Sequence, residues 1–210
     1  MTDLLLTPCE ARVIASLSEK SITTPQYYPM TVNAIMLACN QKSSRDPVMQ
    51  LHEGEVGAAL LDLADKGLAQ RDDAGSRVPK WRQSFQHHLL LQPHTFAVLV
   101  TLMLRGPQTQ AELRSNAAGL GGPTSAEGVA AALQDLADRA VPLVVLLPRA
   151  SGQKEARHAH TLSGPPELPA APEPAAKTER APPASLAALE ERLRELEARV
   201  AALEAKDLPR

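Results

Sequence analysis

Apolar residues recur at helical spacing in two segments of the chain that closely match each other. Residues 56–66 read Val-Gly-Ala-Ala-Leu-Leu-Asp-Leu-Ala-Asp-Lys, and residues 129–139 read Val-Ala-Ala-Ala-Leu-Gln-Asp-Leu-Ala-Asp-Arg. Residues 13–17 match residues 98–102 in the same way, with apolar side chains at equivalent positions. Apolar positions three and four residues apart fall on one face of a helix. The pattern therefore predicts two copies of one small domain.

The first copy is predicted to contain three helices followed by a β-hairpin. Thr7 and Glu10 have the pattern of a capping box, at the start of a helix that ends near Lys20. Further helices are predicted at residues 32–40 and 53–66, and two strands follow at residues 68–71 and 77–85. This order, helix, helix, helix and hairpin, is typical of a winged helix.

The same order is predicted in the second copy. A helix at residues 96–105 is followed by Gly106 and Pro107, which stop helices. Two further helix starts are predicted at capping boxes, Thr109 with Glu112 and Thr124 with Glu127, before strands at residues 143–147 and 155–162. The predicted fold class is mainly α with small β-hairpins (α+β), as tandem winged-helix domains at residues 1–88 and 89–163.

The first copy carries extra chain between its second and third helices. The first helices correspond at an offset of 85 residues and the third helices at an offset of 73, a difference of 12 residues. The extra chain includes residues 39–48, and an addition to a minimal scaffold is a natural place for a specific function. The alternative, which we weight equally, is a spacer that only covers the core.

The end of the chain has a different character. Residues 164–184 are rich in proline and alanine and lack apolar periodicity, which predicts a disordered or semi-extended linker. Residues 185–206 then show heptads, in which Arg192 would face Glu197 of a second copy. A single helix stabilised by i,i+4 ion pairs is the alternative. We favour a parallel coiled coil that makes the protein a homodimer, with its contacts at Leu186, Leu189, Leu193, Leu196, Val200 and Leu203.

Composition narrows the classes of function. The chain has 210 residues and a net charge of −2, so it is not a polycation that would coat nucleic acid, and any basic surface must be local. Two cysteines do not make a disulfide framework and fit a reducing compartment. No apolar run is long enough to span a bilayer, and no signal peptide is recognisable. We therefore expect a cytoplasmic protein without a membrane partner.

Four stretches of the chain resemble the bacterial YceH-like family over roughly residues 4–163. They read Thr7-Pro8-x-Glu10-Ala11-Arg12-Val13-Ile14, Thr23-Thr24-Pro25-x-x-Tyr28-Pro29-x-x-Val32-Asn33, Ala38-Cys39-Asn40-Gln41-Lys42-x-x-Arg45-x-Pro47-Val48 and Leu104-Arg105-Gly106-x-Gln108-Thr109-x-x-Glu112-Leu113-Arg114. The resemblance implies tandem winged helices, and because that family is uncharacterised it implies no chemistry. The chain departs at His52, where family members tend to have a serine cap, and its tail looks like an addition to the family core.

Double-stranded DNA is the first partner to consider, since winged helices commonly insert their third helix into the major groove. Here the third helices carry Asp62, Asp65, Asp135 and Asp138, and carboxylates repel phosphates. The residues predicted to bind nucleic acid or a partner lie instead on the two hairpins and the extra loop. They are Asn40, Gln41, Lys42, Arg45, Arg77, Lys80, Arg82, Arg149, Lys154 and Arg157. Ordinary solvated charges are the simpler interpretation of either hairpin alone. We expect Lys42→Ala with Arg45→Ala to weaken nucleic-acid binding at unchanged thermal stability.

Two other functions compete with DNA binding. Acidic third helices are similar to those of tandem winged-helix adaptors such as the segregation and condensation accessory subunit, which bind a partner protein. An enzyme is the weakest hypothesis: a helix start can lower the pKa of Cys9, but no histidine is close in sequence to act as its base, so Cys9 is interpreted as a capping-turn residue. Cys39 fits a core thiol. His158 and His160 share a strand face without a third metal ligand. We predict no enzyme activity, cofactor or metal, and a DNA-associated or regulatory protein, with a protein scaffold as the alternative.

Overall fold

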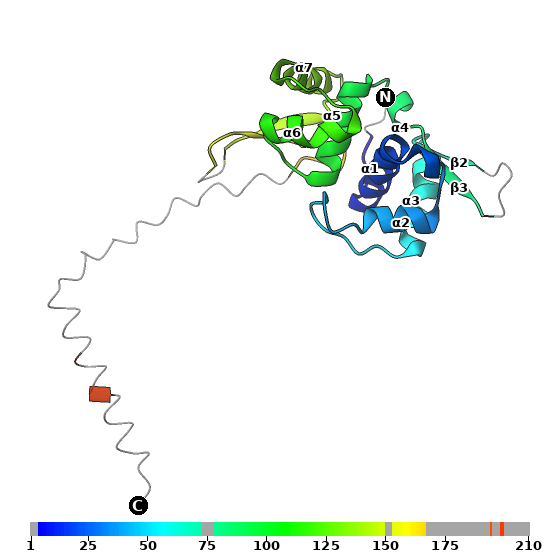
Figure 1. Ribbon diagram of the computed structural model, residues 1–210, viewed down its shortest axis with the longest axis horizontal. Helices are drawn as coiled ribbons and strands as arrows, with labels where there is room; N and C mark the ends of the chain where they lie inside the picture. The colour runs from blue at the N-terminus through cyan, green and yellow to red at the C-terminus, as the bar shows by residue number, and fades with distance from the viewer. Residues whose placement is uncertain (1–3, 73–77, 150–152, 167–193, 195–197, 200–210) are drawn as a thin grey trace, which may run out of the picture. The chain divides into compact units, whose positions relative to one another are not determined.

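The structure is a computed structural model that describes residues 4–72, 78–149 and 153–166, together with Arg194, Ala198 and Arg199 (Figure 1). Met1–Ala170 form one compact unit. Ala171–Arg210 form a second unit, in which the three described residues are helical. The six predicted coiled-coil contact residues lie outside the described residues, so dimerisation through them stays a prediction.

The first half of the compact unit contains three α-helices and a small antiparallel sheet (Figure 1). Its elements are α1 (Pro8–Thr23), the 3₁₀ turn η1 (Pro25–Tyr27), β1 (Met30–Thr31), α2 (Val32–Cys39), α3 (Glu53–Asp65), β2 (Ala69–Asp72) and β3 (Lys80–Gln83). β3 lies between β1 and β2 and is antiparallel to both. β2 and β3 extend away from the helices as a ribbon (Figure 1). The predicted helices and hairpin are confirmed, whereas β1 was not predicted.

Over its described residues, the second half repeats the order of three helices followed by a hairpin, without a strand before its second helix. A short helix, α4 (Phe85–His88), leads into it. The elements that follow are α5 (Pro93–Arg105), α6 (Gln110–Ala117), the 3₁₀ turn η2 (Ala118–Leu120), α7 (Ala126–Ala137), β4 (Val144–Leu147) and β5 (Arg157–His160). β4 and β5 form an antiparallel hairpin. Within the described part of the chain, no helix has the length and apolar content needed to cross a membrane.

The internal repeat also appears in the pattern of buried side chains on α3 and α7. On α3 the buried residues are Val56, Ala59, Leu60 and Leu63, and on α7 they are Val129, Ala132, Leu133 and Leu136. Every member of the second set lies 73 residues after its counterpart, so both helices bury the same face. A helix with an apolar stripe of this kind is stabilised mainly by packing that stripe against the core. The sequence repeat therefore corresponds to a repeat of packing.

Side-chain caps fix where several helices begin. Thr7 accepts a hydrogen bond from the Glu10 backbone N–H, and the Glu10 carboxylate accepts one from the Thr7 N–H. Thr109 and Glu112 form the same capping box at the start of α6. The third predicted box is wrong by one residue, because Ser125 rather than the preceding threonine caps α7.

The two halves share one hydrophobic core. α1 packs against α2, α3 and α5, while α5 packs against α1, α6 and α7. Residues 95–104 of α5 are all buried, which is expected of a helix enclosed on every side. Phe85 packs edge-to-face on Phe96 with ring centroids 6.0 Å apart, and the Leu6 N–H donates to the Leu162 carbonyl at 2.7 Å. Burial of α1 and α5 against each other therefore joins the repeats.

The extra loop, residues 40–52, lies between α2 and α3 and contacts the second half. The Asp46 N–H donates to the Leu104 carbonyl at 2.8 Å, and Arg105 Nη2 donates to Ser44 Oγ at 2.7 Å. Carbonyls in the last turn of a helix have no partner within that helix. The loop thus completes the hydrogen bonding at the end of α5 and attaches the first half to the second.

Candidate functional site

The first hairpin presents basic side chains on the face opposite its tryptophan. Trp81 is buried, Arg82 is exposed and Lys80 is half-buried, as expected because successive side chains of a strand point to opposite faces. Arg82 Nε donates to Asp72 Oδ2 at 2.6 Å, so part of the arginine charge is neutralised within the hairpin. Arg77 lies outside the described residues. The described hairpin is thus a modest basic surface.

Asn40 and Gln41 of the extra loop make hydrogen bonds inside the protein. Asn40 Nδ2 donates to the Leu51 carbonyl and Asn40 Oδ1 accepts from the Leu51 N–H, each at 2.8 Å. Gln41 Oε1 accepts from Arg45 Nη2 at 3.0 Å. The Asn40 amide therefore closes the loop instead of facing a base edge or a partner backbone. Of the four predicted binding residues in the loop, only Lys42 is exposed.

Arg45 is turned into the protein, with only 6% of the residue exposed. Its Nη2 and Nη1 donate to the two carboxylate oxygens of Glu19, at 2.6 and 3.3 Å. Its Nε and Nη2 donate to the carbonyl of Ala38, in the last turn of α2, where a cation is also favoured by the helix dipole. This position differs from the exposed phosphate contact that the sequence suggested, so Arg45 does not join a binding surface.

The second hairpin contributes one structural arginine and two exposed cations. Arg157 donates from both terminal nitrogens to the carboxylate of Glu112, each at 2.9 Å. The backbone N–H of Thr109 and then Arg157 hold the pKa of Glu112 below its usual value. Arg149 and Lys154 are exposed. Arg157 therefore attaches β5 to the start of α6, whereas Arg149 and Lys154 face solvent.

The third helix of each half exposes carboxylates, and we call these surfaces the acidic faces. They consist of Glu53, Glu55, Asp62 and Asp65 on α3, and Glu127, Asp135 and Asp138 on or directly after α7. Lys66, next to the end of α3, forms an ion pair with the buried Glu10. Arg139, its counterpart in the repeat, donates to the Leu89 carbonyl. The cations at these helix ends are thus already engaged within the protein.

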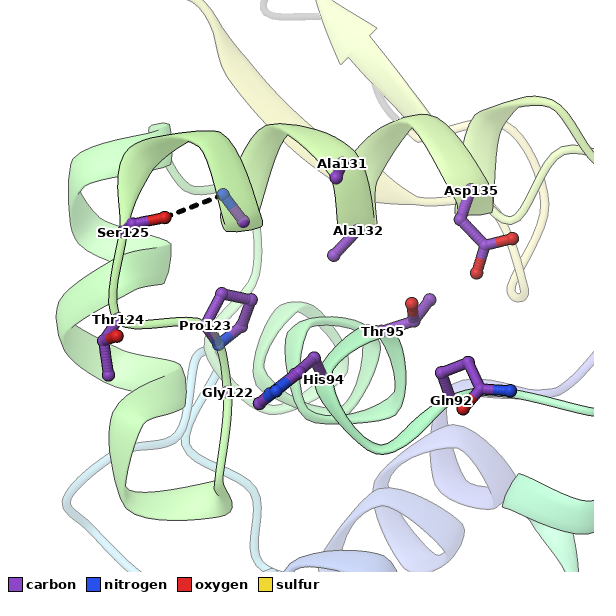
Figure 2. A pocket seen from close by; sticks show the side chains of 11 residues that line it. Gln92, His94, Thr95, Gly122, Pro123, Thr124, Ser125, Ala131, Ala132 and Asp135 are labelled. Atoms are coloured by element: carbon purple, nitrogen blue, oxygen red, sulfur yellow. Dashed lines mark hydrogen bonds between the residues drawn. The ribbon is translucent and has the colours of Figure 1, made fainter.

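A pocket of about 560 Å³ opens beside the acidic face of α7. Figure 2 shows His94 and Thr95 from the start of α5 on one side, with Ala131 and Ala132 of α7 on the other. Asp135 lies at one end of the pocket, so the acidic face continues into it (Figure 2). A concave, partly apolar surface of this volume can accept a side chain of a partner.

Known proteins with similar sequences are found for most of the chain. Residues 6–153 match a family described as "Protein of unknown function, DUF480". The chain belongs to this family. UPF0502 proteins are its relatives: one from Koribacter versatilis is 48% identical over 159 residues, covering 76% of this chain and 74% of the relative. One from Geobacter sulfurreducens is 45% identical over 168 residues, covering 80% and 77%.

Some members of the UPF0502 family match beyond the compact unit. The protein from Azoarcus sp. is 43% identical over 203 residues, which cover 95% of this chain and 90% of the relative. A match of that length extends into the proline-rich segment and the heptads. The tail is therefore shared with other family members, and the family descriptions leave its function open, as they do for the repeats.

Burial shifts the pKa of two kinds of titratable side chain in this UPF0502 protein, the thiols of the two cysteines and the imidazoles of His158 and His160. Burial and the Glu55 carboxylate raise the pKa of the Cys9 thiol, so its place at a helix start does not make it a reactive thiolate. Burial raises the pKa of Cys39 to about 11, as fits a core thiol. Burial lowers the pKa of His158, and lowers that of His160 to about 4. At neutral pH both thiols are protonated and both imidazoles are uncharged.

Proposed function

We propose that this UPF0502 protein is a non-enzymatic, tandem winged-helix adaptor that binds another protein through the acidic faces of α3 and α7. The observation that carries the proposal is the seven exposed carboxylates on these helices. A winged-helix protein that reads DNA places its third helix in the major groove, with phosphates on either side. Carboxylates there are repelled by phosphate, whereas a basic protein surface is attracted to them.

The neighbouring cations offset only a small part of this negative charge, through the ion pair of Arg139 with Asp135. Lys66 is paired with Glu10, and Arg139 is bonded to the Leu89 carbonyl and lies 3.7 Å from Asp135. Exposed charges act over a distance of about 10 Å at moderate salt, so a ligand that approaches either helix meets mainly carboxylates. The faces therefore select a cationic partner.

The chemistry of the partner can be specified further. Leu61 is 56% exposed on α3, among the carboxylates of that helix. The pocket beside α7 has Ala131 and Ala132 on its α7 side, with Asp135 at its end. Binding energy at protein interfaces comes largely from an apolar anchor in a desolvated centre, with charges at the rim that guide association. The surface fits a segment that carries an apolar side chain flanked by lysine or arginine.

Nucleic-acid binding is the second candidate, and a specific observation favours it. Arg71, Arg82, Arg149 and Lys154 are exposed on the hairpins, and Lys42 is exposed on the extra loop. The hairpins are where winged helices contact the DNA backbone, and a few such cations supply sequence-independent affinity that falls with salt. In this alternative the protein would contact phosphates with its hairpins and keep the acidic faces away from them.

Self-association is part of the proposal and rests on the heptads of residues 185–206. A parallel coiled coil would bring two compact units together, and two weak sites for the same partner would then act in concert. Because each chain has two shallow acidic faces, dimerisation would increase the overall affinity of such an adaptor for its partner.

The experiment that tests the adaptor proposal is site-specific photo-crosslinking in cells, with a benzophenone amino acid in place of Ala58 on α3 or Ala131 on α7. We expect a discrete adduct with one protein at these positions and none with the probe at exposed Leu90. The partner, once identified by mass spectrometry and purified, should bind the full chain by calorimetry. Asp62→Lys with Asp65→Lys should weaken that binding at least ten-fold, whereas Glu155→Lys on the second hairpin should not.

The opposite results would replace the proposal by its rival. If no adduct forms at either helix, or if charge reversal on α3 leaves the affinity unchanged, the acidic faces do not bind a protein. Salt-dependent binding of random duplex DNA in fluorescence anisotropy, removed by Lys80→Ala with Arg82→Ala, would establish the hairpins as the functional surface. Under the adaptor proposal the wild-type protein shows no such binding at physiological salt.

A further inference from the structure

A second pocket, of about 280 Å³, lies where the extra loop meets the second half of the molecule. α1, the extra loop, the end of α5 and β5 all contribute to it. Its walls are mainly apolar and include Pro8, Pro47, Met49 and Met103. The volume is close to the lower end of the range for small-molecule sites, which begins at about 300 Å³. The pocket therefore has room for one small molecule with an apolar part.

Arg12 supplies a buried positive charge to this pocket. The residue is 3% exposed, and its terminal nitrogens donate to the carbonyls of Cys39 at 3.2 Å and Pro47 at 2.7 Å. Its Nε is buried and has no hydrogen-bond partner among the described residues. No carboxylate in the described part of the chain forms an ion pair with it. A buried cation is costly unless an anion accompanies it, so Arg12 favours the entry of a negative group.

Asp46 supplies a negative charge to the same pocket. Its backbone N–H is held by the Leu104 carbonyl, which fixes the residue at the pocket edge. Within the described residues its carboxylate accepts no hydrogen bond and forms no ion pair, with Arg12 or with any other cation. The pocket thus contains one cation and one anion that attract each other across it but form no direct ion pair. An uncharged ligand, or one with a single charge, would leave one of them unmatched.

We propose that this pocket binds an α-amino acid with an apolar side chain. The carboxylate of the ligand pairs with Arg12, its ammonium group pairs with Asp46, and its side chain packs against Met49 and Met103. His160 also lines the pocket and adds to its wall. The inference is independent of the adaptor function, because the pocket shares no residue with the acidic faces.

The chain offers internal probes for this site. It has five methionines, of which Met49 and Met103 line the pocket, whereas Met30 and Met36 do not. The experiment is an NMR titration with L-leucine. It uses the full-length protein labelled with ¹³C at the methionine methyl groups and follows the chemical shifts of those groups. We expect saturable shifts of the Met49 and Met103 signals, while the signals of Met30 and Met36 stay in place.

Two analogues of leucine separate its charges. L-leucinamide lacks the carboxylate, and 4-methylpentanoate lacks the ammonium group. Both should bind at least ten-fold more weakly than leucine to the wild-type protein. Asp46→Asn should weaken leucine binding at least ten-fold and strengthen 4-methylpentanoate binding, because the substitution removes a repulsive charge. Asp62→Asn, on the acidic face of α3, is the matched control and should change neither affinity.

Three results would overturn the assignment. The first is the absence of saturable Met49 and Met103 shifts up to the solubility of leucine. The second is binding of leucinamide as strong as that of leucine. The third is an unchanged leucine affinity in Asp46→Asn, which is expected to fold normally because that side chain is exposed. Arg12→Gln, if it folds, should abolish the preference for leucine over leucinamide.

Discussion

Arg45 joins three parts of the first half through one side chain. Its guanidinium bonds the Glu19 carboxylate of α1, the Ala38 carbonyl of α2 and the Gln41 amide of the extra loop. Planar guanidinium groups suit such sites, because their donors are held in a fixed fork that matches a carboxylate. Lys42, three residues earlier, is exposed. Two cations that are neighbours in the sequence therefore have different physical roles.

This difference predicts that alanine substitutions of the two residues affect the free energy of unfolding to different extents. Arg45→Ala should lower the free energy of unfolding by about 3 kcal/mol, since it leaves the largely buried Glu19 carboxylate with only the longer ion pair to Lys20, at 3.5 Å. Lys42→Ala should change it by no more than about 0.5 kcal/mol, as is usual for exposed side chains. Urea unfolding of both variants measures these changes in the free energy of unfolding. Equal stability of the two would show that the Arg45 network contributes nothing, and the sequence-based expectation of an unchanged double variant would hold.

At the scale of the elements, two glycines differ in whether the backbone needs a residue without a Cβ. Gly106 ends α5 with φ 68° and ψ −159°, a conformation that side chains with a Cβ rarely adopt. Gly57 lies inside α3, where a Cβ would meet nothing within 4 Å, and the repeat has Ala130 at the equivalent position. The first glycine is required by the backbone, and the second is a weak point in a helix.

Alanine at these two positions should therefore change stability in opposite directions. Gly57→Ala should raise the free energy of unfolding by about 0.5–1 kcal/mol, because alanine is the better helix former. Gly106→Ala should lower it by about 1–3 kcal/mol through backbone strain. Thermal and urea unfolding of the pair provide the measurement. A destabilised Gly57→Ala would contradict this prediction, because it would mean that a Cβ at position 57 is not accommodated in the folded protein.

The elements that the sequence predicted are those with local causes. Capping boxes at Thr7 and Thr109, and apolar periodicity along α3 and α7, depend on residues a few positions apart. β1 has two residues, too few for any alternation, and was therefore missed. The partners of Arg45 could not be predicted either, because Glu19 lies 26 residues away and meets it only in the folded protein. For the same reason the pocket between Arg12 and Asp46 has no signal in the sequence.

At the scale of the whole molecule, the repeats are not independent. α1 and α5 are the central helices of the two halves, and they bury their faces against each other. The extra loop and the Leu6–Leu162 hydrogen bond add further connections between the halves. A small domain with few aromatic side chains has a limited core of its own, and a shared core buries a larger fraction of the apolar surface. The two repeats should therefore fold as one unit.

The shared core predicts a single unfolding transition. Trp81, the one tryptophan of the chain, is buried in the first half, so its fluorescence reports that half, whereas far-UV circular dichroism reports the helices of both. The two signals should give the same urea midpoint and slope. Leu133→Ala, in the core of α7, should destabilise by about 2–5 kcal/mol and shift the Trp81 transition by the same amount as the dichroism. A biphasic dichroism curve, or a Trp81 midpoint that does not respond to Leu133→Ala, would instead show two domains that unfold separately.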